Sequence, residues 1–267
     1  MPNEYWSKRV LKQSEMIYDK TLGQMQQQLA VYYKQALQDV QADISTLWDT
    51  MLEESLTGEI KANDLYRFNR YYDLQAKINS KLKSLGNNEV DINNKNYTKM
   101  YNKIGEVING NIPEQYINQA YVILPDDRVK QVLDSIWCAD GKNWSTRIWD
   151  NKTLLQQHIE KGLLDSVSRG VPKDKVVEQL MKDFNVGFSM ADRIARTELA
   201  HVQNTASSDN YKQAGIQRVK TIVAHDERLC DICSAHDKEI HNIDDAVDGV
   251  AYLFHAQCRC AIIGIVD

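Results

Sequence analysis

The stretch QRVKTIVAHDERLCDICSA, residues 217–235, decides the fold. It opens with a short alternating and apolar run, residues 217–224, which is typical of a β-strand. Two cysteines separated by two residues, Cys230 and Cys233, follow that run. A second apolar run, AIIGIV at residues 261–266, follows another group of cysteines. The two runs predict a short antiparallel sheet near the C-terminus, carrying a metal-binding knuckle over residues 228–260.

The second ligand group is His255-x-x-Cys258-Arg259-Cys260. A two-residue gap lets both donor atoms of a tight turn face one ion, and two such pairs complete a tetrahedron, for which zinc is the usual metal. The spacing predicts Cys230, Cys233, His255 and Cys258 as ligands of a structural zinc ion. Cys260 lies on the same side of a strand as Cys258, so it is the alternate fourth ligand and otherwise a buried thiol.

Cysteine usage also bears on the compartment. The chain has five cysteines, and its N-terminus lacks the apolar stretch of a secretion signal. In a reducing cytoplasm, clustered cysteines favour metal ligation over disulfides. The competing interpretation is a Cys230–Cys233 redox couple or four unrelated thiols. Cys138, which stands apart, is expected to be a small buried residue.

The N-terminal half is poor in helix breakers. Between Asn3 and Leu85 there is no proline, and only Gly23 and Gly58 interrupt a composition rich in Leu, Gln, Lys and Ala. Apolar residues recur at three- and four-residue steps, which predicts a helix over about residues 4–56. A second helix is predicted over about 64–85, ending at Gly86, with turn chemistry at 87–94 (NNEVDINN) and shorter helices up to 138.

The loop at residues 139–143 is the predicted domain boundary, between a helical region 1–138 and a C-terminal domain 144–267. Helices are predicted over 144–169 and 173–184, and a further helix capped by Ser189 runs to about Ala214, where Gly215 stops it. The fold class is therefore mainly α with a small C-terminal α+β knuckle domain. The long first helix is expected either to project toward a partner or to form a hairpin with residues 64–85.

Composition excludes several classes of function. The net charge of −5 argues against a general basic surface that coats nucleic acid. No run approaches the roughly 20 apolar residues of a membrane-spanning helix, so we expect no membrane contact and synthesis in a cytoplasm.

Enzymatic interpretations centre on the knuckle. The H-x-E spelled by His225 to Glu227 has the residue types of zinc deaminases, but it lies too close to Cys230. His236, His241 and Asn242 make a metal-dependent nuclease the alternative function. Motifs of hydrolases and nucleotide-binding enzymes are absent from the sequence, which favours a protein that is not an enzyme.

The order of the motifs resembles the phage head morphogenesis domain of Mu protein F-like minor head proteins, over about residues 145–267. The residues that carry the resemblance are Ala195-Arg196-Thr197-Glu198, Asn204, Tyr211, Gly215, Asp226-x-Arg228-x-Cys230-x-x-Cys233 and His255-x-x-Cys258-Arg259-Cys260. The order is more specific than any single motif.

The resemblance implies a minor head protein of the virion, made in the host cytoplasm and located in the head interior near the portal. The implied partner is the portal protein, with the major capsid protein, the scaffolding protein and the packaged DNA as further candidates. Relatives of this kind act during head assembly, and ejection with the DNA is part of what the resemblance implies.

Glu198 is predicted to be structural. It lies at the edge of the apolar stripe formed by Ile194, Ala195 and Val202, so it should be partly buried. A buried carboxylate needs a cation or several donors, and Arg228 and Arg259 are the predicted partners. Arg196 points to a different face of the helix.

Overall fold

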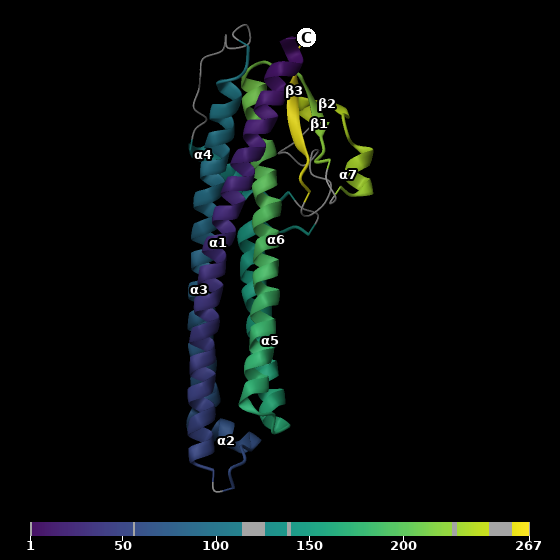
Figure 1. The fold of residues 1–267 in the computed structure, drawn as a ribbon. Helices are drawn as coiled ribbons and strands as arrows, with labels where there is room; N and C mark the ends of the chain where they lie inside the picture. The colour runs from purple at the N-terminus through teal and green to yellow at the C-terminus, as the bar shows by residue number, and fades with distance from the viewer. Residues whose placement is uncertain are drawn as a thin grey trace. The chain divides into compact units, whose positions relative to one another are not determined.

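The computed structural model describes residues 2–55, 57–113, 126–137, 140–225, 229–245 and 258–266. Its elements confirm a mainly helical fold with a small antiparallel sheet at the C-terminal end (Figure 1). The helices are α1 (Pro2–Glu53), α2 (Ala62–Tyr66), α3 (Arg70–Asn109), α4 (Asp126–Asp134), α5 (Trp144–Ser168), α6 (Lys173–Gln213) and α7 (Asp231–Ala235), and the strands are β1 (Arg218–Ile222), β2 (Ile240–Asn242) and β3 (Ala261–Ile265).

The chain divides into two compact units. Unit 1 comprises Met1–Met25, Asn93–Trp144 and Arg193–Asp267, and unit 2 comprises Gln26–Ile92 and Ser145–Asp192. Both units draw on segments before and after the predicted boundary at 139–143. The division into an N-terminal and a C-terminal domain stays a prediction. Within the described residues, no helix combines the length and the apolar character needed to cross a membrane.

Unit 2 is a bundle formed by segments of α1, α3, α5 and α6 (Figure 1). Its core is apolar and draws on every one of these helices, including Val40 and Ile44 from α1, Ile78 from α3 and Ile159 from α5. The long first helix was predicted correctly, and within unit 2 it pairs with α3 in the manner of a hairpin. At its other end, in unit 1, Trp6 lies edge-on to Tyr211 with ring centroids 6.3 Å apart, so the start of α1 does not project freely.

The predicted second helix was wrong at both ends. A short helix, α2, precedes α3, and α3 continues through residues 87–94 to Asn109. Gly86 therefore lies inside α3 and does not end a helix. A Cβ added there would lie 2.6 Å from Cζ3 of Trp149. The glycine therefore allows close contact between α3 and α5. Glu89 and Asn93, which look like turn residues in the sequence, are buried.

A second predicted break is also absent. Residues 173–213 form one helix, α6, and not two. Ser189 does not cap a helix, because its hydroxyl donates to the carbonyl of Asn185 one turn earlier, 2.9 Å away. A Cβ at Gly187 would lie 3.2 Å from Leu155 Cδ2, so this glycine also serves a close helix contact. The predicted end at Gly215 is confirmed by its positive φ of 75°.

The sheet has the order β2-β1-β3, with both pairs antiparallel. The structure confirms the two predicted strands and adds β2, which was not predicted. Val219 in the central strand is opposite His241 on one side and Gly264 on the other. A Cβ at Gly264 would lie 3.1 Å from Cδ1 of Tyr211, so the sheet packs closely on the end of α6 within unit 1.

A polar network is buried in the bundle of unit 2. Lys152 Nζ lies 2.6 Å from Glu89 Oε2, and the hydroxyl of Tyr33 lies 3.1 Å from the same carboxylate oxygen. Asn151 Nδ2 donates to the carbonyl of Gly187 at 2.9 Å, so all four helices of the bundle contribute. Burial raises the pKa of Glu89 and lowers that of Lys152, and it is the largest cause of both shifts. The loss of hydration thus outweighs the attraction between Glu89 and Lys152. The pair aligns the helices but adds little net stability.

Two helical glycines provide a matched test of the close helix contact. We expect Gly86→Ala to destabilise the protein by about 1–3 kcal/mol, because the new methyl group must displace the Trp149 ring. Gly23→Ala is the control: nothing lies within 4 Å of its added Cβ, so it should stabilise the helix by about 0.5–1 kcal/mol. Urea unfolding measures both, and equal effects of the two substitutions would contradict the assigned role of Gly86.

The buried pair gives a second prediction. Lys152→Met should lower the free energy of unfolding by about 3–5 kcal/mol, because it leaves the Glu89 carboxylate buried without its cation. The double variant Lys152→Met/Glu89→Leu should recover most of that loss, since neither charge is then buried. Denaturation at neutral pH tests this, and a single variant as stable as the parent would show that the pair is not desolvated.

Candidate metal centre

Three thiols meet in unit 1, next to the sheet. The Sγ atoms of Cys233, Cys258 and Cys260 all lie within 4.8 Å of one another, and all three side chains are buried. The Sγ atoms of Cys233 and Cys258 are 3.6 Å apart. Among the residues that the structure describes, this is the one group of three or more side chains with metal-ligand geometry.

These separations fit a metal ion. Thiolates at about 2.3 Å from a tetrahedral metal lie about 3.8 Å from each other, close to the observed spacing. A disulfide requires about 2.05 Å between sulfurs, so the cluster is not a set of closed bridges. The Cys260 thiol, predicted as the alternate ligand, belongs to the same cluster as the preferred Cys258.

Cys230 adjoins this cluster through α7. It is the N-cap of that short helix, and its sulfur accepts a hydrogen bond from the backbone N–H of Cys233 at 3.4 Å. An N–H directed at sulfur stabilises negative charge on that sulfur. The first predicted pair thus forms a compact turn with one thiol, Cys233, in the cluster and the other beside it.

The protonation of the thiols depends on a cation. Burial raises the pKa of Cys233 to about 12, with smaller contributions from the neighbouring thiols. The pKa of Cys260 is also raised, first by its hydrogen bond with Cys258 and then by burial. Without a metal these two thiols are protonated at neutral pH, so metal binding must displace protons.

Helix α6 supports the cluster from one side. The Asn204 side chain donates from Nδ2 to the carbonyl of Cys260 at 2.9 Å, in a buried position. Ala200, one turn earlier on α6, packs against the buried cysteines together with Val223. Tyr18 of α1 donates its hydroxyl to the carbonyl of Arg196 at 3.1 Å. Asn204 therefore contacts the backbone of the cluster through its side chain, Arg196 contacts Tyr18 through its backbone, and Thr197 is buried. The structural roles predicted for Arg196 and Thr197 stay predictions.

Glu198, which was expected to be partly buried, is almost completely buried, with 3% of its surface exposed. The indole Nε1 of Trp137 donates to its Oε2 at 2.8 Å, and Trp137 stacks on His201 with ring centroids 4.5 Å apart. No pattern in the sequence points to Trp137 as a partner of Glu198. His201 lies three residues after Glu198 on α6, a spacing that could have indicated a shared face.

Several predicted residues lie outside those that the structure describes, namely Cys138, Asp226, Arg228 and His255. Arg259 is described and half-buried. Its pairing with Glu198, and the choice of the remaining metal ligands, stay predictions.

The residues of the nuclease alternative lie in and before β2. His236 Nδ1 is 2.5 Å from Glu239 Oε2, and His241 Nε2 is 3.7 Å from the same oxygen. Asn242 donates to Asp245 Oδ2 at 3.1 Å. These side-chain contacts join neighbours in the sequence, and the backbone N–H of His236 donates to the carbonyl of Cys233 at 3.0 Å.

Residues 157–263 match the family model described as phage Mu protein F like protein. This region of the chain is similar to the phage Mu protein F-like family. The match contains the C-terminal part of α5, all of α6, β1 and β2, the start of β3 and the thiol cluster, and it confirms the predicted resemblance. Comparison of the chain with curated proteins and with solved structures gave no significant match.

The cluster should hold about one thiolate-preferring metal ion per chain. Cys233→Ser and Cys260→Ser should each reduce metal content well below one ion and lower the melting temperature, because both remove a buried sulfur from the cluster. Because the pKa values of these thiols are raised, protons compete with the metal, so metal retention should fall as the pH is lowered.

Elemental analysis of purified protein across this pH range is the measurement. Cys138→Ser, which changes the cysteine that is distant in sequence, is the matched control and should keep its metal. Full metal content in Cys233→Ser would show that the cluster is not the binding site.

Proposed function

We propose that this chain is a structural protein of the phage head that binds the portal protein from the head interior, and that it is not an enzyme. The observation that carries the proposal is the family match over residues 157–263, since the Mu F-like family suggests a role in phage head morphogenesis. The match spans both the helix that supports the thiol cluster and the cluster itself.

We further propose that the metal is zinc and that its role is structural. Structural zinc sites are closed by four protein ligands, whereas catalytic sites keep a position open for water or substrate. The three described sulfurs are buried, with Cys258 only 2% exposed, and all are thiols, the ligand type most common in structural sites. Zinc would fasten α7 and the start of β3 beside α6, with Cys230 or His255 as the fourth ligand.

The portal-binding surface is assigned to α1. This helix exposes large apolar side chains at positions where a monomer gains nothing from them, notably Tyr5, Met16 and Val31. A partner protein that covers such side chains removes apolar surface from water, which favours binding. Residues 1–85 are not a separable arm, because Trp6 packs on Tyr211 in unit 1. Point substitutions are therefore a better test than deletion.

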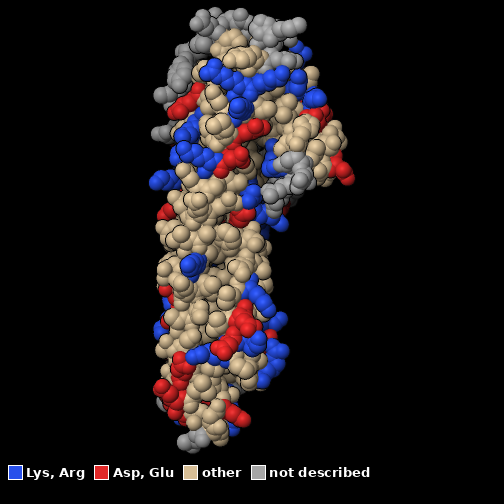
Figure 2. Space-filling model, viewed as in Figure 1, with Lys and Arg blue, Asp and Glu red and all other residues tan. Residues whose placement is uncertain are grey.

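Contact with DNA is a minor part of the proposal. Figure 2 shows acidic and basic side chains interspersed on the face drawn, in keeping with a net charge of −5. Interspersed charges suit protein contacts and do not provide the continuous basic surface that binds phosphates. Ejection with the DNA remains part of the proposed role.

Affinity capture from infected cells tests the assignment. The tagged chain should recover the portal protein, and mass spectrometry of purified virions should detect the chain. Val31→Glu should lower portal recovery at least about tenfold, because it places a charge in an apolar contact. Met181→Glu, which changes an exposed apolar residue of α6, is the matched control and should leave recovery unchanged.

Virions that lack the chain would overturn the proposal. Cleavage of DNA or RNA by the pure protein with a divalent metal, lost in His236→Ala or His241→Ala, would establish the nuclease instead.

A further inference from the structure

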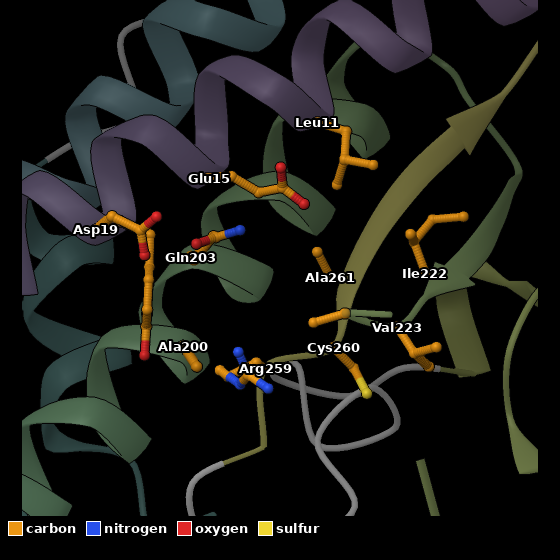
Figure 3. Close-up of a pocket in the computed structure, with 12 residues that line it drawn as sticks. Leu11, Glu15, Asp19, Ala200, Gln203, Ile222, Val223, Arg259, Cys260 and Ala261 are labelled. Atoms are coloured by element: carbon orange, nitrogen blue, oxygen red, sulfur yellow. The ribbon is translucent and has the colours of Figure 1, made fainter. Parts of the chain in front are cut away.

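A pocket in unit 1 lies between α1, α6 and the sheet (Figure 3). Its volume is about 150 Å³, which accommodates a side chain but not a folded segment. Leu11, Ile222 and Ala261 form apolar parts of its lining, while Glu15, Asp19, Gln203 and Arg259 provide its polar groups. Cys260 of the thiol cluster also lines the pocket, whereas Glu15, Asp19 and Gln203 have no part in the proposed role of that cluster.

Gln203 is the feature that points to a ligand. Its side chain is 7% exposed, yet no hydrogen bond joins its amide to any part of the chain that the structure describes. Figure 3 shows this amide directed into the pocket, toward the side that carries Glu15. Because no described group bonds to this amide, its hydrogen-bonding atoms are available to a ligand that enters the pocket.

The acidic side of the pocket is a second, independent feature. Glu15 and Asp19 are four residues apart on α1, and neither makes an ion pair with a described residue. Like charges at this spacing destabilise a helix. Partial burial, and then the charge of Asp19, raise the pKa of Glu15, which indicates that the site disfavours a second negative charge until a cation arrives.

The charges and shape together select the chemistry of the ligand. The two carboxylates outweigh the single guanidinium of Arg259, so one added cation would neutralise the lining. Two carboxylates and an amide oxygen in separate directions match the planar, multi-donor guanidinium group better than a compact ammonium group. The apolar parts of the lining would contact the methylene groups of its stem.

We propose that this pocket binds the side chain of an arginine presented by a partner protein. The carboxylates of Glu15 and Asp19 would accept hydrogen bonds from the guanidinium group, and Gln203 would complete the set of acceptors. The proposal goes beyond the head-protein role and does not depend on it, because it concerns binding by the purified chain.

The test uses the full-length, metal-loaded chain labelled with ¹⁵N. The probe is N-acetyl-arginine amide, and the signal is the side-chain amide resonance of Gln203, identified by its absence in Gln203→Met. We expect a saturable shift of this resonance with arginine and none with N-acetyl-citrulline amide, the neutral isostere. Glu15→Gln and Asp19→Asn should each weaken binding roughly threefold to tenfold, in line with loss of one partly exposed charge pair.

Asp91→Asn is the matched control, because it removes an exposed carboxylate of α3 that does not line the pocket. It should leave the affinity unchanged. Equal shifts with citrulline, or no shift with arginine, would overturn the proposal. Equal affinity for N-acetyl-lysine amide would overturn the choice of arginine. Tighter binding of free arginine would overturn the partner protein as the source of the ligand and indicate a small molecule.

Discussion

The close approach of long helices at glycines is the constraint on which the bundle depends. At Gly86 the neighbouring helix leaves no room for a side chain, and at Gly187 it leaves little. Helices that come this close also bury the polar residues beside the contact, because water is excluded there. Tyr33 and Asn151 then have to find partners among themselves and the backbone. The polar network of unit 2 is thus a consequence of how closely its helices pack.

The same constraint explains why the predicted helix end at Gly86 was wrong. A glycine followed by asparagines has the local chemistry of a helix end, and only the distant Trp149 reveals that Gly86 serves a contact. Gly215 was interpreted correctly because its role is local: it adopts a positive φ, which glycine allows without strain. The strands were also predictable from their local pattern, whereas β2 is too short to show one.

The candidate site divides in the same way. Cysteine spacing was enough to predict a cluster, since the geometry of a two-residue gap is local. The inclusion of Cys260 with Cys233 and Cys258 depends on how β3 enters the sheet, which spacing does not specify. The contact of Trp137 with Glu198 joins residues 61 positions apart and left no trace in the pattern. The motif order singled out Asn204, but it did not predict that its side chain donates to the carbonyl of Cys260.

The pairing of β1 with β3 has a consequence for how relatives are recognised. Ile222 is opposite Ala261, and β2 also pairs with β1, so the segment 243–260 leaves the sheet after β2 and returns to it at a fixed point. The entropy of closing such a loop changes slowly with its length, by about 0.6 kcal/mol for each doubling. Insertions between β2 and the second cysteine group should therefore cost little free energy, whereas changes at the paired strand residues should cost more. A search for distant homologues should fix the short gaps around each cysteine group and let the distance between the groups vary freely.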